Sequence, residues 1–141
     1  MGEATGTVRD ADAMIAGMAP RPDAETWHFC TVESEAAAAL HFPEALATFR
    51  EAEGVSLILP AQAAARHGFR TDLPMARITL GVHSALDGVG LTAAVAAALA
   101  RAGIPCNMVA AFHHDHAFVP QDMADRAMDI LQDLAKRGRA T

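Results

Sequence analysis

A run of histidines and one aspartate at residues 113–116 carries the residue types best suited to chemistry in this chain of 141 residues. Alternate residues of an extended chain share one face, so His114 and His116 can approach the same ion or ligand. Imidazole is a common zinc ligand, and His83, at the end of a neighbouring predicted strand, would supply a third nitrogen. Two other interpretations stay open: the run lines a ligand site, or it forms a polar turn.

A loop with two glycines, residues 83–90, precedes a predicted helix and is the second place where chemistry is expected. The start of a helix offers unpaired backbone N–H groups and partial positive charge, which suit a carboxylate. Glycine lets a ligand approach the backbone closely, whereas Ser84 or Asp87 can instead cap the helix internally. The candidate ligand-binding residues are His83, Ser84, Ala85, Leu86, Asp87, Gly88 and Gly90, with Asn107, His114 and His116 from later in the chain.

No residue is assigned a catalytic role. His83, Ser84 and Asp87 are the residue types of a hydrolase triad. Adjacent residues of an extended chain point apart, however, so His83 is poorly placed to activate Ser84. No GxSxG motif surrounds this serine. The sequence therefore predicts a binding protein without a cofactor in preference to an enzyme.

Charge and composition exclude several kinds of partner. The net charge is −6 with histidine neutral, and nucleic-acid binding begins with basic charge, so no nucleic-acid partner is expected. The longest apolar run, residues 91–100, is about half of the roughly 20 residues that a membrane helix needs. Cys30 and Cys106 form no CxxC pair and suit a reducing compartment. With no secretion signal at the N-terminus, we expect a cytoplasmic protein.

Hydrophobic periodicity and turn residues predict the elements that position these candidates. The predicted strands cover residues 27–32, 55–59, 76–82 and 104–112, with a returning strand from residue 117. The predicted helices cover residues 13–18, 60–68 and 89–102, and a last helix starts at Pro120. Residues 44–51 fit either a strand or a helix.

The second half of the chain follows the order β-α-β-β-α, one strand short of the ferredoxin-like unit. An uncovered sheet edge invites pairing, so the first half or a second subunit should supply the missing strand. We expect a flexible tail at 1–11, an N-terminal half at 12–70 and a C-terminal half at 71–141. The halves are expected to pack together, and the protein to form a homodimer.

Several motifs carry a resemblance to a known family. The stretch ITLGVHSALDGVGLTAAVAAALARAGIPCNMVAAFHHDHAFVP is similar to the core of the ACT domain, where a strand and a glycine loop lead into a helix and a second strand. Gly90 lies where ACT domains place the glycine that opens the helix. Gly103, Ile104 and Asn107 resemble the Gly-Ile-Asn entry to the next strand. Over residues 13–136, FREAEGVSLIL, VHSALDGVGLTAA and HDHAFVP resemble an uncharacterised group of small bacterial tandem ACT-domain proteins.

The resemblance implies an α+β, ferredoxin-like (ACT-type) fold: an antiparallel sheet with helices on one face, in two ACT-like halves. ACT domains bind amino acids or similar small effectors between ACT units, and the first strand–helix loop often holds the ligand. A regulatory protein without catalytic activity of its own is therefore implied, with a small-molecule effector such as an amino acid as its partner. A metal-binding protein or metal-dependent enzyme built on residues 113–116, and a purely structural dimerisation module, remain alternatives.

Overall fold

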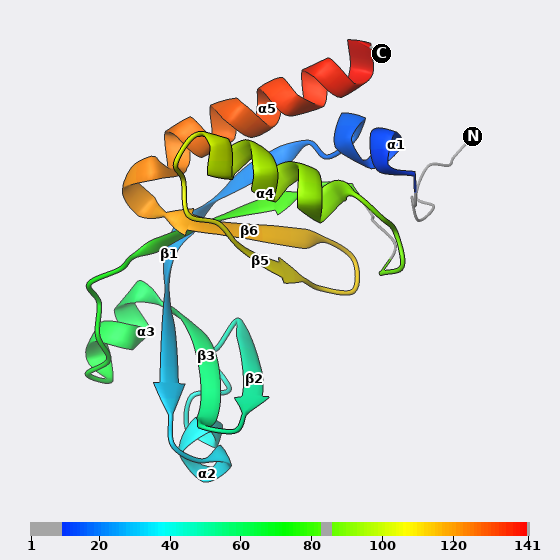
Figure 1. Cartoon of the computed structure of the whole chain (residues 1–141). Helices are drawn as coiled ribbons and strands as arrows, with labels where there is room; N and C mark the ends of the chain where they lie inside the picture. Colours follow the sequence, from blue (N-terminus) through cyan, green and yellow to red (C-terminus); the bar gives the residue numbers. More distant parts are fainter. Residues whose placement is uncertain (1–9, 83–85, 141) are drawn as a thin grey trace. The chain divides into compact units, whose positions relative to one another are not determined.

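The computed structural model describes residues 10–82 and 86–140, and the chain packs as two compact units. The inserted unit comprises Ala24–Met75, and the flanking unit comprises Met1–Asp23 together with Ala76–Thr141. The sequence colouring in Figure 1 follows the chain through both units, and the strand β1 (Pro20–Val32) contributes residues to each. The inserted unit therefore interrupts the flanking unit along the chain.

In the flanking unit, the helices lie against one side of a sheet whose strand order is β1-β4-β6-β5. β5 and β6 form an antiparallel hairpin, and the segment from β4 to α5 has the predicted order β-α-β-β-α. Its elements are α1 (Ala11–Ala16), the start of β1 (Pro20–Val32), β4 (Met75–Leu80), α4 (Leu91–Arg101), β5 (Asn107–Ala110), β6 (Asp115–Pro120), a short 3-10 helix (Gln121–Met123) and α5 (Ala124–Ala140).

The start of β1 supplies the strand that the sequence left unassigned. It lies beside β4, where Arg77 pairs with Asp23 at a distance of 2.9 Å between Nη2 and Oδ2. The helix α1 also belongs here, because it packs against α4 and α5. A Cβ at Gly138 of α5 would lie only 3.2 Å from Cγ2 of Ile15, so glycine allows this close helix contact. The two compact units therefore do not coincide with the predicted halves at residues 12–70 and 71–141, because residues before Asp23 pack with the C-terminal part of the chain. The division into two ACT-like halves stays a prediction.

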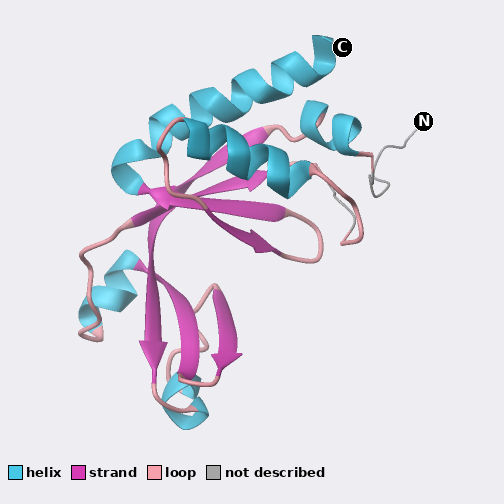
Figure 2. Cartoon of the chain, viewed as in Figure 1, coloured by secondary structure: helices cyan, strands magenta, loops and turns pink. Residues whose placement is uncertain are grey.

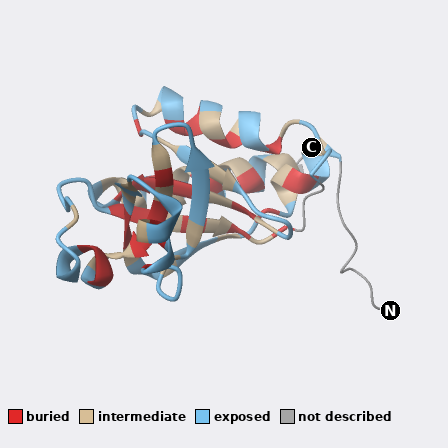
Figure 3. Cartoon of the chain, turned by 90° about the horizontal axis from the view of Figure 1, so that it is seen from below, coloured by how far each residue is buried: buried red, intermediate tan, exposed pale blue. Residues whose placement is uncertain are grey.

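The core of the flanking unit lies between its helices and its sheet, and Figure 3 shows buried residues on both. The apolar stripe predicted on α4 is confirmed, since Leu91, Val95 and Leu99 are buried. On α5 the buried residues are spaced four apart, as helical periodicity requires: Ala127, Leu131 and Ala135. The core side chains with less than 2% exposure include Met14, Met18, Ile78, Leu80, Val95, Leu99, Val119 and Leu131.

The inserted unit is a smaller antiparallel arrangement of three strands in the order β2-β3-β1. β3 pairs with both neighbours, so that Ile58 lies opposite Phe29 on one side and Ala47 on the other. Its further elements are α2 (Glu35–Ala39), β2 (Ala47–Glu51), β3 (Gly54–Pro60) and α3 (Ala61–Arg66). Its small core consists of Ala38, Val55, Leu57, Leu59 and Ala64.

Several element boundaries differ from the sequence-based predictions for local reasons. The first helix begins at Ala11 instead of residue 13, because the Asp10 side chain accepts a capping hydrogen bond from the Ala13 amide at 2.9 Å. Pro60 is extended (ψ 148°) and serves as the last strand residue and the N-cap of α3. Residues 44–51 resolve into a loop followed by the strand β2.

The polar turn predicted over residues 113–116 is shifted towards the N-terminus. The amide of Ala111 donates to the carbonyl of His114 at 3.0 Å and closes the turn there. Asp115 and His116 therefore already belong to β6, and the preceding strand ends at Ala110. Within residues 10–82 and 86–140, no helix is both long and apolar enough to cross a lipid bilayer.

Candidate ligand-binding site

A small pocket of about 110 Å³ lies in the flanking unit, where α4 begins beside the β5–β6 hairpin. α1 contributes its floor through Met14, which is only 1% exposed. The pocket is lined by Met14, Leu86, Gly88, Gly90, Leu91, Thr92, Ala110 and Asp115. The lining residues therefore come from segments that are far apart in the chain: α1, the start of α4 with the loop before it, and the β5–β6 hairpin.

Gly90 sets the geometry of the wall that α4 provides. It is the N-cap of the helix with a φ of +112°, in the region that L side chains rarely adopt. A Cβ at this position would lie 2.8 Å from the Cβ of Ala11. The N-cap glycine has no side chain, so it supplies no capping oxygen to the first amides of this 11-residue helix. Those amides and the partial positive charge of the helix start favour an anionic ligand group.

Asp115 contributes to the lining of the same pocket from β6. It is the first residue of β6 and lies across the hairpin from Ala110, which also lines the pocket. Side chains alternate along a strand, so Asp115 shares its face with Ala117 and Val119, which are fully buried in the helix-covered core. Asp115 itself is 8% exposed. Among the described residues it is the one carboxylate that is buried, and it lies at a pocket.

His114 and His116 point to the other face of the sheet, away from Asp115. Nδ1 of His114 lies 3.3 Å from the carbonyl oxygen of Val82, and Nδ1 of His116 lies 3.0 Å from Oγ1 of Thr79. Burial holds the pKa of His116 below its ordinary value, helped by the positive charge of Arg77 and by His114, and opposed by Asp115. These two histidines thus make contacts with β4 and the segment after it, and they do not line the pocket.

The other predicted site residues divide into three groups. Leu86, Gly88 and Gly90 line the pocket. Asp87 lies in the same loop but neither lines the pocket nor occupies the N-cap position, and Asn107 is exposed at the start of β5, opposite Phe118. His83, Ser84 and Ala85 lie outside the described residues.

The metal site considered above has no support in the described part of the chain. Among those residues, no group of three or more His, Cys, Asp or Glu side chains could hold a metal ion. The proposed set used His83 as its third ligand, and His83 is not described.

Sequence reasoning missed five residues that line the pocket: Met14, Leu91, Thr92, Ala110 and Asp115. For Asp115 the sequence did contain a usable pattern. Alternate residues of a strand share a face, so Asp115 lies on the same face as the apolar Ala117 and Val119, and His114 and His116 lie on the other. This alternation predicts that Asp115, and not the histidines, lies on the face that the helices cover. No local pattern could have linked Met14 to this loop, because the contact is made only by folding.

The inserted unit has a pocket of about 320 Å³ at the corresponding place, between the β1–α2 loop and the β2–β3 hairpin. Several of its polar groups already make contacts within the inserted unit. Ser34 caps the five-residue helix α2 by accepting a hydrogen bond from the Ala37 amide at 3.1 Å. Arg50 and Glu35 form an ion pair at 2.5 Å in which both side chains are largely exposed. This pocket is therefore open, and its arginine already forms an ion pair with Glu35.

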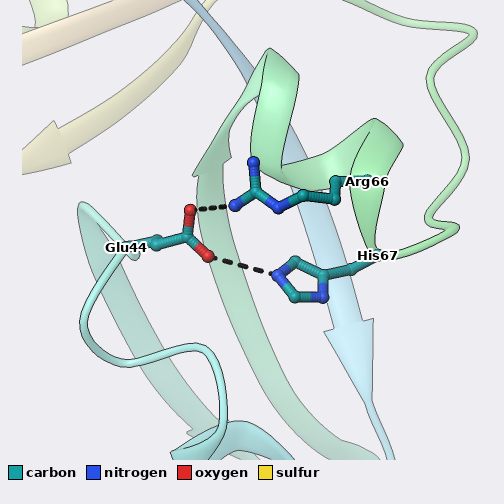
Figure 4. A network of polar contacts seen from close by, with 3 residues as sticks. All are labelled: Glu44, Arg66 and His67. Carbon is teal, nitrogen blue, oxygen red and sulfur yellow. Dashed lines mark hydrogen bonds and ion pairs between the residues drawn. The ribbon is translucent and has the colours of Figure 1, made fainter.

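A second polar network ties α3 to the loop before β2 (Figure 4). Glu44 accepts a hydrogen bond from Arg66, and its Oε1 lies 3.2 Å from Nε2 of His67. The hydrogen bonds from Arg66 and then His67 hold the pKa of Glu44 below its ordinary value. The ring of His41 lies edge-on to that of His67, with 4.7 Å between centroids. Nδ1 of His41 is buried without a hydrogen-bond partner in the described part of the chain, and we assign no function to this network.

Comparison with known protein families agrees with this architecture. Two models, each described as an ACT domain, match the chain in tandem, one over residues 7–76 and the other over residues 75–133. The chain belongs to the ACT-domain family. The α+β, ferredoxin-like fold with its antiparallel sheet, expected from the sequence, is confirmed.

Several solved structures are similar to this ACT-domain protein. A protein of unknown function from Vibrio cholerae, a possible transport protein, is 40% identical, with 88% of this chain and 94% of that chain covered and a TM-score of 0.78. The ligand-free regulatory subunit of aspartate kinase from Thermus thermophilus is 11% identical, covers 82% and 95% of the two chains, and has a TM-score of 0.61. A protein from Agrobacterium tumefaciens is 17% identical, with coverage of 79% and 84% and a TM-score of 0.60. No curated protein sequence matches the chain.

Proposed function

We propose that this ACT-domain protein is a regulatory module that binds an amino acid in the pocket at the start of α4. The observation that carries the proposal is the pocket itself, which the start of α4, with a glycine as its N-cap, and the buried Asp115 line together. Family membership supports a ligand-binding regulatory role. The fold shared with the regulatory subunit of aspartate kinase supports the same role.

The lining offers each kind of contact that a small polar metabolite needs. The amides at the start of α4 suit a carboxylate, and the hydroxyl of Thr92 can donate or accept a hydrogen bond. Met14 and Leu91 are 1% and 3% exposed and form an apolar floor. A few directed polar groups over an apolar floor are typical of a small-molecule site.

Regulation would follow from a change in populations. A ligand can shift a conformational equilibrium only by its difference in affinity for the two states. The pocket joins α1, the start of α4 and the β5–β6 hairpin, so an occupied pocket favours the arrangement in which these three segments stay together. In this proposal the protein acts in the cytoplasm as a homodimer and passes its state to a partner.

A thermal-shift screen against the twenty amino acids tests the proposal, followed by isothermal titration calorimetry on each hit. A ligand at 100 times its dissociation constant stabilises the native state by about 2.7 kcal/mol. Absence of binding by every amino acid would contradict the proposal. Binding of divalent metals alone would instead favour the metal-binding alternative.

Two matched variants locate the site. Thr92→Arg places a long side chain in the small pocket from an exposed position, and it should abolish binding. Ala93→Arg adds the same charge at the next exposed residue of α4, which does not line the pocket, and it should bind as the wild type does. Equal loss in both variants, or in neither, would place the ligand elsewhere.

A further inference from the structure

The flanking unit has a second pocket, an open groove of about 470 Å³ between the segment that begins β1 and the helix α5. Its lining residues are Ala19, Pro20, Arg21, Gln132, Ala135 and Lys136. None of them lines the pocket at the start of α4. The groove is therefore separate from the site proposed above.

Arg21 and Lys136 give the groove two positive charges that the described residues leave uncompensated. Both side chains are exposed, and neither forms an ion pair or a hydrogen bond within the described ranges 10–82 and 86–140. The nearest carboxylates along the chain are Asp23 and Asp133, and each is already paired with another arginine, at 2.9 Å and 3.3 Å. In a protein whose net charge is −6, such a groove is a local positive region that attracts an anion.

The wall at the start of β1 is held in a fixed shape. Arg21 lies between Pro20 and Pro22, whose rings restrict φ to about −65°. Ala19 has a φ of +38°, in the left-handed region that L residues seldom adopt. A Cβ on Gly81 would lie only 3.1 Å from the carbonyl oxygen of Ala19, so the chain after β4 packs closely against this turn. A wall that is already ordered loses little conformational entropy when a ligand binds.

The helix α5 forms the other wall. Gln132 and Lys136 are four residues apart and therefore lie on one face of the helix. Ala135 between them is only 2% exposed and anchors this part of α5 in the core of the unit. The groove thus presents a guanidinium from one wall and an ammonium and an amide from the other.

We propose that this groove binds a phosphoryl group between Arg21 and Lys136. A phosphoryl group carries a charge of about −1.5 to −2 at neutral pH, which matches two cations. The planar guanidinium can donate two parallel hydrogen bonds to its oxygens, the ammonium adds a point charge, and the amide of Gln132 donates to a further oxygen. A ligand with a single carboxylate would leave one of the two cations unmatched.

The test is an NMR titration of the full chain with inorganic phosphate and with glycerol 3-phosphate, at constant ionic strength and about pH 8, where phosphoryl groups are dianions. The amide resonances of Arg21, Gln132 and Lys136 should shift and reach saturation. Arg21→Gln and Lys136→Gln should each weaken binding about 10-fold, the lower end for a hydrogen bond to a charged group. Tighter binding of glycerol 3-phosphate would assign the groove to a phosphorylated metabolite, and tighter binding of inorganic phosphate to the free ion.

Arg101→Gln is the matched control. Arg101 is also exposed and without a partner in the described part of the chain, but it lies in the last turn of α4 and outside the groove. Its replacement should leave phosphate binding unchanged, and Lys136→Arg, which keeps the charge, should retain most of it. Equal loss in Arg101→Gln and Arg21→Gln would show unspecific attraction by surface charge and overturn the proposal.

Succinate, a dianion with two planar carboxylates, tests the chemical class of the ligand. It should bind more weakly than inorganic phosphate, and equal affinity would mean that the groove responds to charge and not to the phosphoryl group. Phosphate shifts that never saturate would also overturn the proposal. Arg21→Gln should bind amino acids as the wild type does, so this proposal and the proposed function stand or fall separately.

Discussion

Each unit of this ACT-domain protein contains a strand that turns into a helix beside a hairpin. In the inserted unit the elements are β1, α2 and β2–β3, and in the flanking unit they are β4, α4 and β5–β6. The two helices differ in their N-cap residue. Ser34 supplies a capping oxygen to α2, whereas α4 begins at Gly90, which has no side chain.

The two pockets differ in size and in the groups that line them. The pocket of the inserted unit is the larger, about 320 Å³ against about 110 Å³. Its Arg50 and Glu35, however, are paired with each other and exposed. The smaller pocket is lined by the buried Asp115 and by the start of α4, whose N-cap glycine has no side chain.

The largest effect is expected at Gly54, in the hairpin of the inserted unit. Its φ is +149°, and a Cβ there would lie 2.2 Å from the carbonyl oxygen of Val32, a backbone atom with little room to move. Gly54→Ala should lower the free energy of unfolding by about 3 kcal/mol, the upper end for local backbone strain. Gly68→Ala is the control, with a positive φ of +79° but nothing within 4 Å, and should lose only about 1 kcal/mol. Urea denaturation measures both, and equal losses would contradict the close contact.

Gly90→Ala in the flanking unit should have an intermediate effect, about 2 kcal/mol. Its φ is also positive, but the added Cβ meets the Cβ of Ala11 at 2.8 Å instead of a backbone carbonyl. Adding Ala11→Gly removes this overlap and should restore part of the loss, although glycine within α1 carries its own penalty. A double-mutant cycle by urea denaturation gives the coupling energy. A coupling near zero would mean that the two residues do not touch.

Removing the cap of α2 should have a smaller effect. Ser34→Ala deletes the oxygen that accepts from the Ala37 amide and should lower stability by about 1 kcal/mol. Ser34→Gly gives α2 the same N-cap residue as α4 and should lower it by only a few tenths of a kcal/mol. If the alanine and glycine variants lose the same stability, Ser34 does not cap the helix in solution.

The smallest effects are expected from pH, and they differ between the units. The folded pKa of His116 lies below its ordinary value of 6.5, so its contribution is complete above that pH and falls as acid is added through it. The folded pKa of Glu44 lies below 4.5, so its contribution is lost only below pH 4.5. In an NMR titration from neutral to acidic pH, residues of the flanking unit around His116 should therefore change their chemical shifts before residues of the inserted unit around Glu44. Loss of the low-pH response in Glu44→Gln, but not in Glu53→Gln, would assign it to the network with Arg66 and His67.

Much of the fold was predictable because it depends on local signals. Gly103 after a run of alanines and leucines marked the end of α4, and the buried spacing of Leu91, Val95 and Leu99 followed from helical periodicity. The order β-α-β-β-α was also visible. The missing fourth strand was not, because the start of β1 reaches β4 only after the whole inserted unit has been traversed.

The candidate site was predictable in part. The sequence by itself determined that residues near Gly88 and Gly90 would open a helix, since glycine and helical periodicity act over a few residues. Only the tertiary structure decided that Asp115 lies at the pocket beside the start of this helix. Strand register and the packing of α1 bring Asp115 and Met14 to the start of α4 and turn His114 and His116 to the other face. Contacts between segments so far apart depend on register and packing, which no local pattern encodes.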